Sequence, residues 1–178
     1  MEGIEENIRD YKGARELLRC DKTAFLCSRK VPPSIVLKCY DWAIGQRDAG
    51  HCIISGFHSQ IEKDVLHYLL KGEQPIVITL ARGIMERTDP ILAAEIEKGR
   101  LLMITPFDAT VTRVSQHTAN KRNNLIAGLA DEIFVPYAQE GGNVGNVIFG
   151  WLKKGKIVKT LDVQENRALI DAGAVTIG

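Results

Sequence analysis

Residues 121–143 read KRNNLIAGLADEIFVPYAQEGGN, and this order of polar, apolar and glycine residues decides the fold class. Two cations and two amides stand at the front of a predicted helix whose later half is apolar. The apolar run at 133–135 then predicts a buried strand, and Gly141 and Gly142 predict a loop that begins another helix. In a parallel α/β sheet, both helix entrances would lie at the edge where ligands bind.

The same order of helix, glycine and short apolar strand recurs along the chain. A glycine ends a predicted helix at Gly50, Gly72, Gly99, Gly155 and Gly173, where it can adopt the left-handed conformation of a helix cap. Strands are predicted at 23–27, 52–55, 75–80, 101–104, 133–135, 156–158 and 174–177. Apolar strands without alternation are typical of sheets covered on both faces. We therefore predict an α/β fold with a Rossmann-like, doubly wound, mostly parallel sheet of about six or seven strands flanked by helices.

The predicted helices carry their own signals. One apolar face comprises Val144, Val147, Ile148, Trp151 and Leu152, which follow helical spacing. Asp89 followed by Pro90 is typical of a helix start. Residues 1–21 are charged and have only weak apolar spacing, so we predict an N-terminal helical extension there and a Rossmann-like domain over 22–178.

Composition indicates one globular domain without a strong overall charge. The chain has 178 residues, 45% of them hydrophobic and 25% charged, with a net charge of +1, so any basic surface must be local. Four cysteines form no C-x-x-C pair and do not group with the histidines, so we expect reduced thiols and no metal site. No apolar run reaches the ~20 residues of a membrane span. The acidic N-terminus lacks a secretory-signal pattern, and we expect a cytoplasmic protein that binds no membrane.

Basic, hydroxyl, amide and glycine residues follow the predicted strands, where a parallel sheet gathers its ligand edge. They are Ser28, Arg29, Lys30, Ser55, Gly56, Phe57, His58, Ser59, Arg82, Arg87, Lys121, Arg122, Asn123, Asn124, Gly141, Gly142 and Asn143. Cations, amides and free backbone N–H groups at one edge suit phosphate. The basic residues at 29–30 and 82–87 equally suit solvated loops, and Ser59 with Glu62 fits a helix capping box.

The sequence offers no catalytic arrangement. His58 stands at a strand exit, where stacking or hydrogen bonding is a more natural role than catalysis, because no Ser-His-Asp or metal set can be assembled from the spacing. Neither G-x-G-x-x-G nor a Walker A sequence occurs, so NAD and ATP have no specific support. We expect a binding protein rather than an enzyme, with no cofactor.

These residues together resemble the Rossmann-like core of the DNA-processing protein A family. The family pattern F-P-x-R-N-R-I-I-A-G-L-S corresponds to ANKRNNLIAGLA at 119–130. Its G-S-R after the first strand corresponds to CSR at 27–29, its S-G loop to 55–56, and its S-G-[SA] loop to GGN at 141–143. The resemblance covers roughly residues 23–162, and the helix with the two cations is its most specific part.

The resemblance implies a function and partners. Members of that family bind single-stranded DNA, form dimers and help to load a recombinase during natural transformation, so it implies a single-stranded DNA binding protein acting as a homodimer. The chain departs from the pattern in several places: Cys27 replaces the glycine of G-S-R, the loop S-G-x-A-x-G-I-D reads SGFHSQIE at 55–62, the Phe-Pro before the cation helix is absent, and Asn124 replaces an arginine. It also lacks room for the flanking domains of full-length members and is therefore similar to a short, core-only relative.

Two alternatives stay open. A nucleotide-binding enzyme or sensor related to the lonely-guy phosphoribohydrolases would use a P-G-G-x-G-T-x-x-E loop, whereas the loop at 141–145 lacks the threonine and the following glutamate, so a general acid or base is missing. The other alternative is a structural remnant with an empty pocket.

Overall fold

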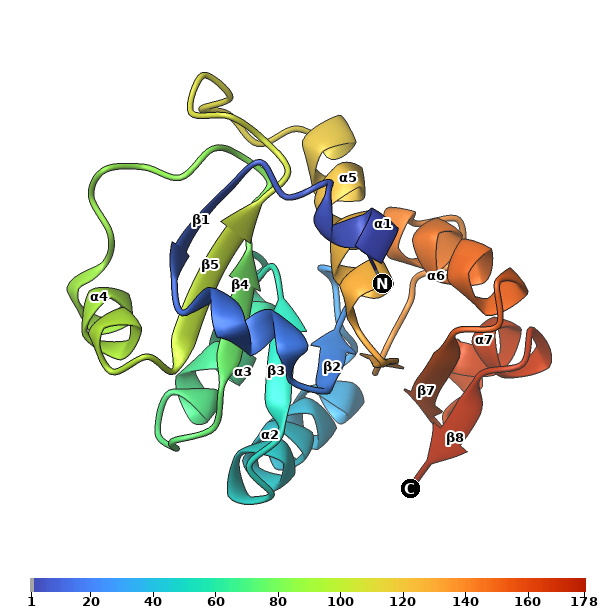
Figure 1. Ribbon diagram of the computed structural model, residues 1–178. Coiled ribbons are helices and arrows are strands. Elements are labelled where there is room, and N and C mark those ends of the chain that lie inside the picture. Colours follow the sequence, from blue (N-terminus) through green and yellow to red (C-terminus); the bar gives the residue numbers. More distant parts are fainter. Residues whose placement is uncertain (1) are drawn as a thin grey trace.

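A computed structural model describes residues 2–178 and contains an eight-stranded sheet in the order β1-β5-β4-β3-β2-β6-β7-β8 (Figure 1). The strands are β1 (Asp10–Gly13), β2 (Lys22–Phe25), β3 (Cys52–Ser55), β4 (Ile76–Thr79), β5 (Leu101–Thr105), β6 (Glu132–Val135), β7 (Ile157–Leu161) and β8 (Val175–Ile177). All neighbouring pairs are parallel except β1 with β5, which is antiparallel. The predicted α/β class and mostly parallel sheet are confirmed.

Helices cover both faces of this sheet (Figure 1). They are α1 (Glu2–Glu5), α2 (Pro33–Asp48), α3 (Gln60–Leu69), α4 (Pro90–Glu97), α5 (Gln116–Leu129), α6 (Asn143–Lys153) and α7 (Arg167–Asp171), with short 3-10 turns η1 (Arg15–Arg19) and η2 (Gln164–Asn166). Helices α2, α3 and α4 pack over one apolar layer that includes Phe25, Ile53 and Phe134. Helices α5 and α6 pack over the other, which includes Ile54 and Ile133.

The doubly wound topology creates a switch point between β2 and β6. From β2 the chain moves outward through β3 and β4 to β5, and it then crosses back to place β6 on the other side of β2. Helices that follow neighbouring strands diverge to opposite faces there, which leaves a crevice at the carboxyl ends of the strands.

The N-terminal segment differs from the predicted helical extension. Only residues Glu2–Glu5 form an α-helix, whereas Asp10–Gly13 form β1, in which Lys12 pairs with Met103 of β5. The backbone of β5 would otherwise lack a partner on that side, and pairing satisfies its exposed N–H and C=O groups. A four-residue strand at an edge has no readable alternation, so the sequence pattern gave no sign of it. It is the eighth strand, beside the seven whose apolar runs were predicted.

Helix α5 begins earlier than its cations suggested. A reciprocal capping box starts it: the Ser115 N–H donates to Thr118 Oγ1 at 2.8 Å, and the Thr118 N–H donates to Ser115 Oγ at 3.2 Å. Lys121 and Arg122 therefore lie in the second turn rather than at the front of the helix. Because the helix dipole acts mainly within the first turn, it does not explain why an anion would bind near them.

Several local predictions are confirmed. Asp89 caps α4 through hydrogen bonds to the N–H groups of Ile91 and Leu92, and Ser59 with Glu62 forms the predicted capping box of α3. Four of the predicted glycine stops have positive φ, at Gly50, Gly99, Gly155 and Gly173, whereas Gly72 does not. In the part of the chain that the structure describes, no helix combines the length and the apolar character that a membrane crossing requires.

Candidate functional site

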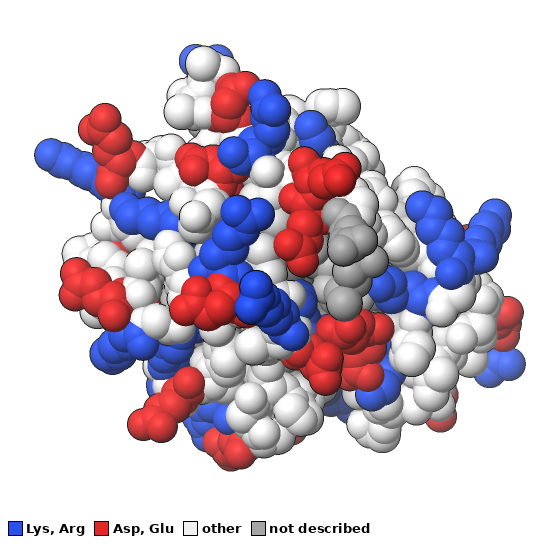
Figure 2. Space-filling view, in the orientation of Figure 1, with Lys and Arg blue, Asp and Glu red and all other residues white. Residues whose placement is uncertain are grey.

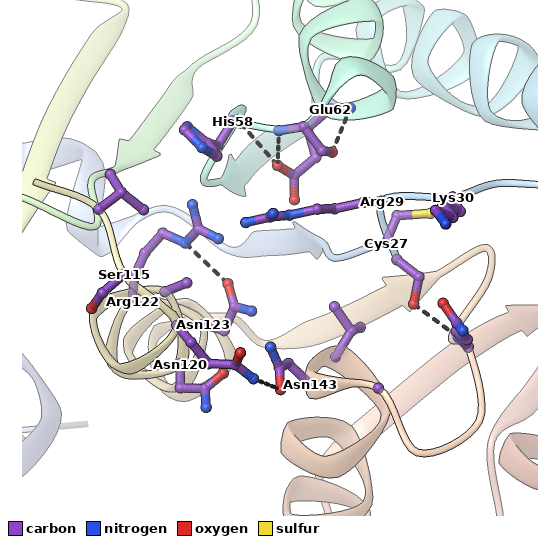
Figure 3. A pocket seen from close by; sticks show the side chains of 18 residues that line it. Cys27, Arg29, Lys30, His58, Glu62, Ser115, Asn120, Arg122, Asn123 and Asn143 are labelled. Carbon is purple, nitrogen blue, oxygen red and sulfur yellow. Dashed lines mark hydrogen bonds between the residues drawn. The ribbon is translucent and has the colours of Figure 1, made fainter.

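A pocket of about 520 Å³ opens at the switch point of the sheet (Figure 3). Its walls come from the loop after β2, the start of α3, the first two turns of α5 and the loop that begins α6. These are the elements that diverge around β2 and β6, so the topology itself creates the cavity. Its volume lies within the range of ~300–1,000 Å³ that is usual for small-ligand sites.

Arg122 is the most unusual residue in the pocket wall. Its side chain is only 7% exposed, its Nε–H donates to Asn123 Oδ1 at 3.0 Å, and its guanidinium packs directly on Gly56. Within residues 2–178 no carboxylate oxygen lies within 4.0 Å of its nitrogens. Burial lowers the pKa of Arg122, and the neighbouring Arg29 lowers it further, while Glu62 opposes both. Arginine nevertheless stays charged, so a cation is held here without a paired anion.

Arg29 faces this buried cation. It comes from the loop after β2, and Figure 3 shows its side chain extended across the pocket toward Arg122. In the described chain it too has no carboxylate oxygen within 4.0 Å. Two like charges that approach each other in a partly desolvated cavity repel, and leaving one buried charge uncompensated costs several kcal/mol. An anion between the two guanidinium groups would offset both the repulsion between the cations and the cost of the uncompensated buried charge.

Glu62 is the one carboxylate that lines the pocket in the described chain, and it is directed toward backbone. Its side chain is 4% exposed, and its Oε2 accepts hydrogen bonds from the N–H groups of His58 at 2.8 Å and Ser59 at 3.0 Å. These bonds complete the α3 capping box and fix the loop (Figure 3). Glu62 therefore shapes the pocket floor and moderates its charge without pairing with Arg122.

The start of α6 forms the opposite wall. Gly142 caps this helix without a side-chain hydrogen bond, and its first turn carries no acidic residue. The first N–H groups of a helix have no partner within the helix and attract anions. Asn143 accepts a hydrogen bond from Gln116 of α5, and Ser28 Oγ accepts one from the N–H of Gln139 at 2.8 Å. These two bonds join three of the segments around the pocket.

His58 lies beside the two arginines, and its side chain is exposed. Partial burial lowers the pKa of His58, Arg122 and Arg29 lower it further, and Glu62 acts in the opposite direction. The folded protein therefore takes up this proton at a lower pH than the unfolded chain, for which the usual value is about 6.5.

This shift predicts a pH dependence of stability. Because the unfolded state binds the His58 proton more readily, the free energy of unfolding should fall as pH drops through about 6.5 and level off below the folded-state pKa. His58→Asn lacks this contribution. The free energy of unfolding of the variant minus that of the parent should therefore be larger at about pH 5 than at about pH 7.5. Urea unfolding at both pH values measures this, and a constant difference between the two proteins would contradict it.

Nine of the residues expected from the sequence line the pocket together. They are Ser28, Arg29, Lys30, His58, Ser59, Arg122, Asn123, Gly142 and Asn143. They come from four separate segments of the chain, of which three follow β2, β3 and β6 and the fourth lies within α5.

Other expected residues lie elsewhere. Lys121 points away from the pocket lining, with its Nζ 5.1 Å from the centroid of the Phe107 ring, and Asn124 Oδ1 accepts from Trp151 Nε1 on α6 at 3.2 Å. Arg87 lines a separate, shallower cavity of about 410 Å³ beside the loop after β4. Arg82 is not among the residues that line this cavity, although the next residue in the chain, Gly83, is. Gly141 is exposed and has a φ of 69°.

Three expected residues at the end of β3, namely Ser55, Gly56 and Phe57, lie behind the pocket, whereas His58 and Ser59 of the same loop line it. Ser55 Oγ donates to the Phe25 carbonyl at 2.7 Å and ties β3 to β2. Phe57 has a positive φ of 47°, which turns its ring into the core, where it is 6% exposed. The expected stacking surface at Phe57 is therefore not available in this conformation. Gly56 lies against the Arg122 guanidinium, where a side chain would collide with it.

Sequence reasoning missed part of the pocket lining. Cys27, Gln116, Asn120 and Gln139 contribute to it, as does Glu62, which was expected only to cap a helix. A usable signal existed in α5, because Gln116, Ala119, Asn120 and Asn123 follow the i, i+3, i+4, i+7 spacing of one helix face. The described residues contain no cluster of three or more His, Cys, Asp or Glu side chains suited to a metal ion.

The chain is similar to known proteins in both sequence and fold. The family profile for DNA recombination-mediator protein A matches residues 10–170. DNA processing protein A from Streptococcus pneumoniae superposes with a TM-score of 0.78 at 18% identity, covering 94% of this chain and 62% of that one. DNA processing protein A from Helicobacter pylori, whose structure was determined to explain its single-stranded DNA binding mode, gives 0.76 at 16% identity, covering 98% and 86%.

A third solved structure shows how widely this fold is used. The molybdenum cofactor binding protein from Rippkaea orientalis superposes with a TM-score of 0.63 at 14% identity, covering 90% of each chain. No curated protein sequence matches the chain significantly. The chain spans less than two thirds of the Streptococcus protein, and the likeness to these structures concerns the fold alone. The profile match covers most of the sequence, and the chain therefore belongs to the DNA recombination-mediator protein A family.

Proposed function

We propose that this protein binds single-stranded DNA by holding strand phosphates in the pocket at the switch point. The observation that carries the proposal is the buried guanidinium of Arg122, which faces Arg29 and lies beyond 4.0 Å from every described carboxylate. Guanidinium groups bind phosphate oxygens in a bidentate manner. Family membership and the DNA-binding Helicobacter relative support a nucleic-acid ligand over other anions.

The distribution of charge supports recognition within a confined site. Over the face drawn in Figure 2, basic side chains are interspersed with acidic ones, and the net charge of the chain is only +1. This face therefore lacks the broad basic surface with which duplex DNA is commonly held. A single strand can enter a pocket and bring its phosphates to a few well-placed cations. Lys30 at the pocket and Lys121 outside it would contact neighbouring phosphates.

Salt dependence tests the proposal. Fluorescence anisotropy of a labelled oligo(dT) should show binding whose affinity falls with salt, with a log–log slope of about −1.4 or steeper if at least two phosphates are neutralised. Lys153→Gln controls for the loss of one positive charge away from the pocket. Lys153 lies on α6, is exposed and does not line the pocket, so the affinity should stay nearly unchanged. Absence of binding, or binding that salt does not weaken, would contradict the proposal.

The family relationship extends the proposal to partners and location. We propose that the protein acts as a homodimer in the cytoplasm and assists a recombinase on the bound strand. The exposed edge at β8, where Val175 is 56% exposed, offers one surface on which a second copy could pair. Light scattering should give twice the monomer mass, and a monomeric mass at micromolar concentration would contradict the dimer.

A further inference from the structure

We infer that the pocket prefers a terminal phosphate monoester of a nucleotide to the phosphodiester inside a strand. A strand end and a free mononucleotide both carry this group, which is a doubly charged phosphate attached to one nucleoside. The inference deepens the proposed function and, for strand ends, rests on it. Three independent features of the pocket carry it.

The first feature is the charge of the lining. Among the described lining residues, Arg29, Lys30 and Arg122 are cations and Glu62 is the one carboxylate. With His58 neutral, the lining therefore carries a surplus of two positive charges. A phosphodiester supplies one negative charge, whereas a monoester carries about 1.5 to 2 at pH 7. The monoester matches the surplus, and the match matters most beside the buried Arg122, where water screens charges poorly.

The second feature is the arrangement of donors. The Arg122 guanidinium approaches from α5, Arg29 from the loop after β2, and the N-terminus of α6, which has no side-chain cap hydrogen bond, from the opposite wall (Figure 3). A monoester presents three terminal oxygens to such donors, whereas a diester has two because its other two oxygens are bonded to sugars. The Gln116–Asn143 and Ser28–Gln139 hydrogen bonds join the walls next to α6. A strand end needs one opening in such a pocket, whereas an internal segment needs an entrance and an exit.

The third feature points to a nucleotide rather than to bare phosphate. Asn120 lines the pocket, and its Oδ1 is buried without a hydrogen-bond partner in the described chain. An amide oxygen can only accept hydrogen bonds. Inorganic phosphate at neutral pH offers few donors, but a nucleotide carries N–H or O–H groups on its base or sugar. A buried acceptor without a partner is destabilising, and rotation of the half-buried Asn120 amide toward the cavity would let a nucleotide donor satisfy it.

Matched strands test the preference. An oligo(dT) phosphorylated at both ends is compared by anisotropy with an unphosphorylated oligo(dT) lengthened until the total charge is equal. The end-phosphorylated strand should bind about 10-fold more tightly, as one additional charge-assisted contact implies. Thymidine 5′-monophosphate should displace a labelled strand at a lower concentration than thymidine or inorganic phosphate. Arg122→Gln should abolish the preference, Lys153→Gln should retain it, and melting temperatures should show that both variants are folded.

The outcomes separate this inference from the proposed function. Equal, salt-sensitive binding of both strands would overturn the preference and leave strand binding in place. Displacement by inorganic phosphate as readily as by thymidine 5′-monophosphate would overturn the assignment to a nucleotide. Binding of the mononucleotide without binding of any strand would support the monoester preference and overturn the proposed function. Binding of none of these ligands would overturn both.

Discussion

Replacing Arg122 by glutamine is expected to weaken the binding of single-stranded DNA by about 30- to 160-fold, since a charge-assisted contact in a desolvated site contributes about 2–3 kcal/mol. The guanidinium is buried, faces the pocket and has no carboxylate within 4.0 Å among the described residues. Anisotropy titration with oligo(dT) measures the loss. The melting temperature should not fall, because the substitution removes an uncompensated buried charge.

Lys121→Gln is the matched comparison for this prediction. It removes the same charge one residue away, but Lys121 is exposed and lies over the Phe107 ring outside the pocket lining. A contact made in water contributes only up to about 1 kcal/mol, so the affinity should fall by no more than about fivefold. Equal losses in the two variants would show that general surface charge, and not the pocket, holds the strand.

Gly56→Ala is expected to reduce DNA affinity by about 10-fold or more while changing the free energy of unfolding by less than about 1 kcal/mol. A Cβ at this position would overlap the Nη1, Cζ and Nε atoms of Arg122. Those atoms form the end of a side chain, so the protein can accommodate the methyl group by moving the guanidinium out of its binding position. Anisotropy and urea unfolding on the same variant measure both effects.

Gly45→Ala controls for the general effect of adding a methyl group to glycine. Gly45 lies within α2, and no atom lies within 4 Å of the position its Cβ would occupy. Alanine in a helix interior should stabilise the protein by about 0.5–1 kcal/mol and leave DNA affinity unchanged. If Gly56→Ala also left the affinity unchanged, the position of Arg122 would not matter for binding.

The parallel sheet could be predicted because its signals are local. Each inner strand is a short apolar run, and glycines such as Gly50 and Gly99 mark the ends of the preceding helices. Strand β1 could not be predicted, since its four residues DYKG carry no alternation and are fixed by an unpaired neighbour far along the chain. Tertiary pairing, rather than local preference, decides such an edge.

The site could be predicted only in part. Arg122 shares a helix face with Ile126 and Leu129, so its burial was readable from spacing, whereas Lys121 is turned by about 100° around the helix and points outward. The inward turn of Phe57 depends on a positive φ that a phenylalanine seldom adopts. The amide at Asn120 was missed because the cations at 121 and 122 marked the front of the predicted helix, although α5 begins at Gln116.

The most direct test of the account is to observe the pocket guanidinium groups while DNA binds. Side-chain Nε–Hε signals of the arginines can be followed by NMR as oligo(dT) is added. The account predicts that the signals of Arg122 and Arg29 shift in step with binding, and that the signal of Arg87, beside the separate cavity, shifts far less. Binding that moves Arg87 and leaves Arg122 and Arg29 unchanged would contradict it.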